Sequence, residues 1–381
     1  MKERGRFLTM LAVAAIFLSS VADAATINVG PGESIQAAVN AAGPGDTIEV
    51  QNGVYHESLN ISRQLVLEGK GHPLLDPGAI GSGITLRANG VAVSGFDIRT
   101  TRRTGIYILS SNNVIKNNTV SGCLDGIRLD HSVGNMVAFN DVNNNTNGIT
   151  LFYSRRNIIK SNIIKHNNVN EESDCGIFLT HSQENVLQDN NMLEDGDCAI
   201  SLRSSSSNFL LDNNVSRNDW YGISLSESSN HNIISGNNAS SNKAAGIYLD
   251  SSQGNSLLEN KATDNSKGIY LNYDSNNNFL EGNNVSSNEN GMHLANHSSN
   301  NTIKDNTALN NGNGIYLTFS SGWNLIFGNH LVDNVYNAYD MGLNNRWDNG
   351  SIGNYYSNLG QIFYVPGGPG VDRHPMAVPE R

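Results

Sequence analysis

The feature that most constrains the fold is a short motif, Gly-Ile-x-Leu, that recurs along most of the chain. Consecutive copies lie 21 to 24 residues apart, except for one step of 28 residues from Gly148 to Gly176. A fixed period in the twenties predicts a solenoid, in which each turn of the chain stacks on the turn before it. The motif starts at Gly83, Gly105, Gly126, Gly148, Gly176, Ala199, Gly222, Gly246, Gly268, Gly291 and Gly314, with a degenerate copy at Asn337.

Two rows of asparagines repeat in the same register. The first row starts at Asn113 and each of its members is followed five residues later by a second asparagine, as in Asn113 and Asn118. Short amide side chains tolerate the left-handed backbone of tight corners, and stacked amides can bond to the copies above and below. We therefore predict asparagine ladders at the corners of the solenoid.

Apolar residues alternate with period two between these marks, which is typical of short β-strands. Three inward rows start at Ile106, Ile115 and Val120. The return segments, such as Asn-Asn-Val-Ser-Ser-Asn, are too short for the helix of a leucine-rich repeat. The pattern predicts an all-β fold, a right-handed parallel β-helix with three sheets, about twelve turns and a length of roughly 55–60 Å.

The two ends of the chain differ from the repeats. Residues 1–24 have basic residues, an apolar run and the site Ala22-Asp23-Ala24, which predicts a cleaved signal peptide, with a retained anchor as the alternative. Residues 25–82 are expected to form an N-terminal cap, with a helix over 34–42, and the first turns. Residues 83–340 form the repeats, and the aromatic-rich residues 341–381 a C-terminal cap.

Composition excludes some partners. The chain carries a net charge of −11 without a basic stripe, so we expect no nucleic-acid partner. After signal cleavage no segment is apolar enough to span a membrane. We expect a monomer that is secreted, periplasmic or attached to the cell surface.

Four segments carry a family resemblance. Pro44-Gly-Asp-Thr-Ile-Glu-Val50 with Gly53-Val-Tyr-His-Glu57 resembles the entry segment of the pectin-lyase-like β-helix superfamily. The tail, Trp347-Asp-Asn-Gly-Ser-Ile-Gly-Asn-Tyr-Tyr-Ser357 followed by Asp372-Arg-His-Pro375, is similar to the closing segment of NosD-like proteins. The resemblance implies a secreted β-helix protein of a group often linked to carbohydrate binding and sugar hydrolysis. It also implies, for the namesake, periplasmic copper delivery to nitrous-oxide reductase.

One group of polar residues occupies four adjacent turns. Tyr, His, Arg and Asp side chains together can catalyse the lyase or epimerase reaction of a uronate. In such a set His131 would be the base and Tyr153 the acid, with Arg128 and Asp130 as the further members. The Asp-Pro-His motif of alginate epimerases is reduced here to Asp130-His131, and polygalacturonase motifs are absent. A binding groove without catalysis, or an ordinary polar surface, explains the same residues. The proposed substrate-binding members are Arg155, Arg156, Phe178, His181 and Arg203.

A second set of aromatic residues falls on successive turns and suits either sugar rings or cross-strand stabilisation. It comprises Tyr248, Tyr270, His293 and Tyr316. Cys175 and Cys198 each precede a repeat start, so they stack on adjacent turns and are a disulfide candidate, or simply two small buried residues.

The histidines do not have the spacing of a metal site. His131 and His181 are two turns apart, roughly 9–10 Å by strand spacing, whereas ligands of one metal lie within roughly 4 Å of each other. The segment between Ser357 and Asp372 also lacks the acidic residues that NosD-like relatives carry there. We predict no cofactor, because the ligand spacing supports neither copper nor calcium, although both stay open as alternatives. The leading hypothesis is a non-catalytic protein that binds a glycan or surface polymer, with a polysaccharide lyase or uronate epimerase, and a copper-accessory protein, as alternatives.

Overall fold

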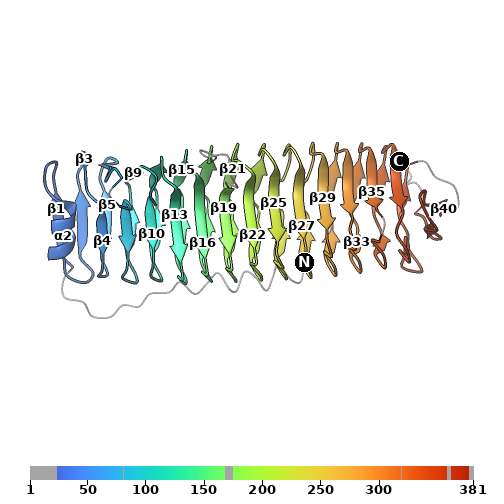
Figure 1. Ribbon diagram of the computed structural model, residues 1–381, viewed down its shortest axis with the longest axis horizontal. Helices are drawn as coiled ribbons and strands as arrows, with labels where there is room; N and C mark the ends of the chain where they lie inside the picture. Colours follow the sequence, from blue (N-terminus) through green and yellow to red (C-terminus); the bar gives the residue numbers. More distant parts are fainter. Residues whose placement is uncertain (1–23, 80, 168–174, 319, 358–361, 377–381) are drawn as a thin grey trace.

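The chain forms a straight rod of stacked turns (Figure 1). The computed structural model describes residues 24–381 except 80, 168–174, 319, 358–361 and 377–381. The predicted signal peptide, apart from Ala24, and the acidic insertion of the long repeat lie outside the described residues. Nearly every strand pairs in parallel with the strand one turn away, which gives the predicted parallel β-helix of the right-handed type.

Three faces of the rod are long sheets, and their strands are as follows. The 14-stranded sheet contains β1 (Thr26–Val29), β2 (Thr47–Val50), β5 (Val66–Gly69), β8 (Ala92–Ser94), β11 (Val114–Lys116), β14 (Met136–Ala138), β17 (Ile158–Lys160), β20 (Val186–Gln188), β23 (Phe209–Leu211), β26 (Ile233–Ser235), β28 (Ser256–Leu258), β30 (Phe279–Glu281), β33 (Thr302–Lys304) and β36 (Leu325–Phe327). The 13-stranded sheet contains β4 (Leu59–Ile61), β7 (Ile84–Leu86), β10 (Ile106–Ile108), β13 (Asp125–Asp130), β16 (Asn147–Phe152), β19 (Cys175–Thr180), β22 (Cys198–Arg203), β25 (Tyr221–Ser226), β27 (Ala245–Asp250), β29 (Lys267–Asn272), β32 (Asn290–Leu294), β35 (Asn313–Leu317) and β38 (Tyr336–Asp340).

The third face is divided into an 8-stranded and a 4-stranded part. The first part contains β3 (Val54–Tyr55), β6 (Leu74–Leu75), β9 (Asp97–Arg99), β12 (Thr119–Ser121), β15 (Asp141–Asn143), β18 (Ile163–Lys165), β21 (Asn191–Leu193) and β24 (Asn214–Ser216). The second contains β31 (Asn284–Ser286), β34 (Thr307–Leu309), β37 (His330–Val332) and β39 (Tyr355–Tyr356). Single parallel bridges through Asn238 and Lys261 join the two parts.

The turns are more numerous than the motif count predicts. The longest sheet has 14 strands among the described residues, against about twelve expected turns. Three strands of this sheet, β1, β2 and β5, lie before the first Gly-Ile-x-Leu motif, whereas among the described residues no strand of the sheet follows the degenerate copy at Asn337. The three predicted inward rows are confirmed, since Ile106, Ile115 and Val120 are each 0% exposed and the rows continue along the core.

The repeated glycines have a steric cause. A Cβ atom built on Gly291 would lie 2.5 Å from the carbonyl oxygen of Gly314, on the next turn. No ordinary contact is so short, so a side chain at this position would push the stacked turns apart. Position 199 carries alanine in place of this glycine and is still fully buried.

The asparagine ladders are hydrogen-bonded along the rod. Asn237 Oδ1 accepts from the backbone nitrogen and from Nδ2 of Asn213, both at 3.0 Å. Asn213 Nδ2 also donates to the Leu187 carbonyl oxygen at 2.9 Å, so the amide satisfies backbone groups as well as its neighbour. The prediction that these asparagines adopt the left-handed backbone is wrong. The residue before each one does so instead, as Asp212 does with a φ of 53° before Asn213.

Both ends of the rod are covered. Helix α2 (Ile35–Ala41) lies against β1, β2 and β4, and its predicted N-cap, Ser34, accepts a hydrogen bond from the Ala37 nitrogen at 3.1 Å. At the other end, the antiparallel pair β40 (Phe363–Tyr364) and β41 (Val371–Asp372) lies beyond the last turn (Figure 1). There Trp347, which is fully buried, donates from Nε1 to Asp340 at 2.9 Å.

Candidate functional site

Three aromatic rings are stacked at one corner of the rod, directly after strands β13, β16 and β19. They belong to His131, Tyr153 and His181, and we call them the corner stack. Ring centroids are 5.0 Å apart from His131 to Tyr153 and 4.8 Å apart from Tyr153 to His181, with interplanar angles of 18°. All three residues are exposed.

The backbone explains why the rings coincide. The three residues have φ values of 49°, 46° and 49°, and each is followed by a fully buried serine of a hydroxyl ladder, such as Ser154. Because the strands pair in register, equivalent side chains leave the corner in the same direction, one turn apart. The left-handed backbone recurs at many corners of this fold, so it is a structural requirement rather than a sign of function.

A charged network adjoins one end of the corner stack. Asp130 Oδ1 lies 2.6 Å from His131 Nδ1, and Asp130 Oδ2 accepts from the Tyr107 hydroxyl at 3.0 Å. Arg128 bonds to Asp125 and Asp130, each at 3.3 Å, and lies 4.1 Å from the centroid of the Phe152 ring. Partial burial opposes ionisation, but the hydrogen bonds from His131 and Tyr107 and the Arg128 charge lower the pKa of Asp130. This carboxylate is therefore anionic and is hydrogen-bonded to the Nδ1 edge of the His131 ring.

The remaining predicted arginines are dispersed. Arg156 points from the next corner and pairs with Glu184 at 2.6 Å, while Arg203 pairs with Glu227 at 3.4 Å and lies 5.9 Å over the Phe178 ring. Arg155, on the segment between these corners, is exposed and has no carboxylate partner among the residues that the structure describes. The structure thus brings together Arg128, Asp130 and the corner stack, with Arg155 next to them in the chain.

The second aromatic set forms a continuous ladder on the outer face of the 13-stranded sheet. Successive centroid distances from Tyr221 through Tyr248, Tyr270 and His293 to Tyr316 are 4.6, 5.3, 4.8 and 4.8 Å. His293 is only 9% exposed because the rings of Tyr270 and Tyr316 stack on its two faces. Burial, with a contribution from Lys267, lowers the pKa of His293 to about 4, so the ring is neutral.

Tyr221 was not predicted as part of this ladder. It precedes the repeat glycine, and its backbone pairs with Ala245 rather than with Tyr248. Its ring nevertheless reaches across to Tyr248, at a centroid distance of 4.6 Å and an angle of 9°. Only the direction of the side chain, which the repeat pattern does not encode, places it there.

The described residues do not fit a copper site. They contain no group of three or more His, Cys, Asp or Glu residues that could hold a metal ion. His131 and His181 are separated by the Tyr153 ring, so they cannot share one ion. Cys175 and Cys198 are register partners, as predicted, and both side chains are buried, so the disulfide between them stays a prediction. A hydrogen bond with Cys175, together with burial, raises the pKa of Cys198 well above its usual value.

Solved structures that share this fold include two mannuronan C-5 epimerase modules and a DFA-IIIase. The A-module of mannuronan C-5 epimerase AlgE6 of Azotobacter vinelandii superposes with a TM-score of 0.70 at 15% identity, covering 77% of this chain and 93% of the module. The AlgE4 A-module of the same organism gives 0.67 at 14%, covering 76% and 94%. DFA-IIIase from Arthrobacter chlorophenolicus A6 gives 0.56 at 14%, covering 70% and 88%. At these identities the likeness establishes the fold.

Sequence comparison identifies the family. No curated protein sequence matches the chain. A separate finding concerns membranes: in the described part of the chain, no helix has the length and apolar character that crossing a bilayer requires. One family model, described as periplasmic copper-binding protein (NosD), matches residues 58–238 and 220–360. These matches span most of the repeats, and the chain therefore belongs to the NosD family.

Proposed function

We propose that this protein is a monomeric periplasmic or cell-surface β-helix protein that binds a carbohydrate polymer on the corner stack without catalysing a reaction. The observation that carries the proposal is the set of three exposed, stacked rings. The His131 side chain is 73% exposed, and Tyr153 is 54% exposed. Contiguous exposed aromatic surface on a rigid scaffold is a common feature of binding sites.

The corner stack is preorganised for such a role. The Asp130 carboxylate fixes the His131 ring, and stacking fixes Tyr153 and His181 relative to it. A ligand that lies on these rings therefore costs little side-chain ordering. Arg155 supplies a nearby guanidinium with donors for hydroxyl or carboxylate oxygens. The mannuronan epimerases, which share this fold, support a carbohydrate as the ligand class.

Catalysis by the same residues is the alternative. The 2.6 Å contact between Asp130 and His131 favours it, because a carboxylate that orients an imidazole is a common arrangement for a general base. Two features favour binding instead. The His131 and Tyr153 rings lie face to face at 18°, so their polar atoms do not flank a position for a substrate carbon. Arg128, which belongs to the predicted catalytic set, already engages two carboxylates.

The experiment separates binding from chemistry. Electrophoresis of the mature chain through gels containing acidic or neutral polysaccharides measures binding. Unsaturated-uronate absorbance and NMR of the recovered polymer measure lyase and epimerase products. We expect retardation by at least one polysaccharide and an unchanged polymer. A product that disappears in both His131→Ala and Tyr153→Phe would establish the enzymatic alternative, and no retardation by any polymer would overturn the proposal.

A further inference from the structure

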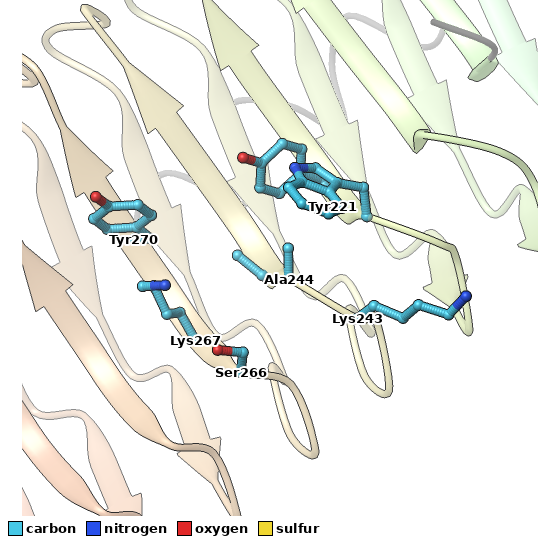
Figure 2. Close-up of a pocket in the computed structure, with 8 residues that line it drawn as sticks. Tyr221, Lys243, Ala244, Ser266, Lys267 and Tyr270 are labelled. Carbon is cyan, nitrogen blue, oxygen red and sulfur yellow. The ribbon is translucent and has the colours of Figure 1, made fainter. Parts of the chain in front are cut away.

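A hollow of about 300 Å³ lies on the outer face of the 13-stranded sheet, between strands β25, β27 and β29. It is several turns away from the corner stack along the rod. Figure 2 shows Tyr221 on one side of it, Lys267 and Tyr270 on the other, and Ala244 between them. Its volume lies at the lower end of the range of small-molecule sites. The lining residues are Trp220, Tyr221, Lys243, Ala244, Ala245, Ser266, Lys267 and Tyr270.

Side-chain size along one row of the sheet explains why the hollow exists. Tyr221, Ala245 and Lys267 are register partners on successive strands, so their side chains form one row across the stacked turns. Alanine in the middle of this row leaves the space that a long side chain would fill. Ala244 adds a second small side chain beside it. The hollow is thus a consequence of two alanines between larger residues.

One wall of the hollow is an exposed indole. Trp220 is 53% exposed, and its ring meets Tyr221 edge to face, with centroids 6.0 Å apart and an angle of 81°. Tyr221 in turn stacks on Tyr248, the next member of the aromatic ladder. The indole therefore rests on a fixed support while much of its surface stays open to a ligand, which is a favourable position for a contact with a sugar ring.

The opposite wall carries an unneutralised cation. The Lys267 ammonium lies 5.1 Å from the centroid of the Tyr270 ring and has no carboxylate partner within the described ranges. Lys243, at the rim, is already paired with Asp219 at 2.5 Å. The hollow thus holds one uncompensated positive charge in a chain whose net charge is −11. An anionic group is the complement of such a site.

We propose that this hollow is a subsite for one acidic sugar residue, whose carboxylate lies on the Lys267 ammonium and whose ring lies against the Trp220 indole. The proposal rests on the proposed function, because it takes the ligand to be a glycan, and it adds the class of that glycan, a uronate. The contact between the sugar carboxylate and Lys267 would lie on the outer face of the 13-stranded sheet, and the corner stack has no equivalent of it. A neutral sugar would leave the Lys267 charge unmatched and should bind less tightly.

The test uses trigalacturonate as probe and its methyl ester as the neutral comparison. Titration calorimetry measures affinity, and the change in indole fluorescence that Trp220→Ala abolishes reports contact with Trp220. Lys267→Met, which keeps the length of the side chain, should weaken trigalacturonate binding on the order of tenfold or more and leave the ester unaffected. Trp220→Ala should weaken both. Lys116→Met, which removes an exposed lysine from the 14-stranded sheet, is the matched control and should change neither.

The outcomes distinguish this inference from the proposed function. If trigalacturonate binding falls in Tyr153→Ala but survives in Lys267→Met and Trp220→Ala, the corner stack binds the glycan and the hollow does not, so this inference is wrong. If Lys267→Met weakens the binding of trigalacturonate and of its methyl ester equally, the hollow does not recognise the carboxylate, and the assignment to uronates is overturned. If the wild-type chain binds neither this probe nor any polysaccharide in the gels, both proposals fail.

Discussion

Asp195→Asn is expected to raise the free energy of unfolding, strongly at pH 8 and much less at pH 4.5. A further ladder, separate from the two asparagine rows described above, runs through Asn167, Asp195 and Asn218 on successive turns. Asp195 thus stands at a position that is asparagine in both neighbouring turns. Its Oδ1 accepts from the backbone nitrogen and Nδ2 of Asn167, at 3.0 and 2.9 Å. Its Oδ2 stands where an amide would donate, and it has no hydrogen-bond partner in the described structure.

The magnitude follows from the buried carboxyl. Burial raises the pKa of Asp195 from 3.8 to about 7, although the Asn167 hydrogen bonds act in the opposite direction. Because the folded pKa is above the unfolded value, the folded chain holds this proton more tightly. Stability is full below about pH 4 and falls as the pH rises from there to about 7. At 1.36 kcal/mol per pKa unit, the loss at pH 8 is on the order of 4 kcal/mol.

Urea denaturation followed by circular dichroism at pH 4.5 and pH 8 is the assay. Relative to the wild type, Asp195→Asn should raise the free energy of unfolding by about 4 kcal/mol at pH 8, and much less at pH 4.5. Asn218→Asp, which places a carboxyl one rung further on, is the matched control and should destabilise mainly at pH 8. An Asp195→Asn variant with the same stability difference at both pH values would refute the reasoning.

Three further predictions concern the ladders and the cysteines. Asn237→Ala removes the acceptor for the backbone nitrogen and Nδ2 of Asn213. It should therefore lower the free energy of unfolding by roughly 2–5 kcal/mol. An unfolding midpoint in urea equal to that of the wild type would contradict a stabilising role of the asparagine ladder. His293→Tyr should be more stable than the wild type by about 2 kcal/mol at pH 5 and nearly equal at pH 7.5. The reason is that a pKa of about 4, below the usual 6.5, makes the wild type lose stability as the pH falls. Mild oxidation should join Cys175 and Cys198 in a disulfide and leave Cys123 as a thiol. A count of three thiols after oxidation would exclude this disulfide.

The sequence predicts the fold of this protein well because the same structural residues recur in each repeat. Inward isoleucines, corner asparagines and the repeat glycine recur at one period, so an error at one copy does not disturb the register of the rest. The location of the left-handed residues was predicted wrongly. The ladder asparagine is fixed by hydrogen bonds to its neighbours, and the preceding residue, whose identity varies from Asp212 to Gly236, turns the corner.

The candidate site was less predictable, because it depends on side-chain direction rather than on period. The sequence placed His131, Tyr153 and His181 on successive turns, and the structure shows that their rings stack. It did not indicate that Arg128 would be engaged by two carboxylates or that His293 would be buried. The hollow beside Ala245 was also missed, since a small residue at an outward position looks unremarkable until its neighbours are known.

The most direct test of the account compares two tyrosines that have the same kind of corner position. Tyr153 and Tyr273 are 54% and 55% exposed and both have a left-handed backbone, but only Tyr153 is stacked between two described rings. The measurement is the dissociation constant for a polysaccharide that retards the wild-type chain. Tyr153→Ala is predicted to weaken binding by about tenfold or more, and Tyr273→Ala to change it little. Equal affinities for both variants would contradict binding at the corner stack.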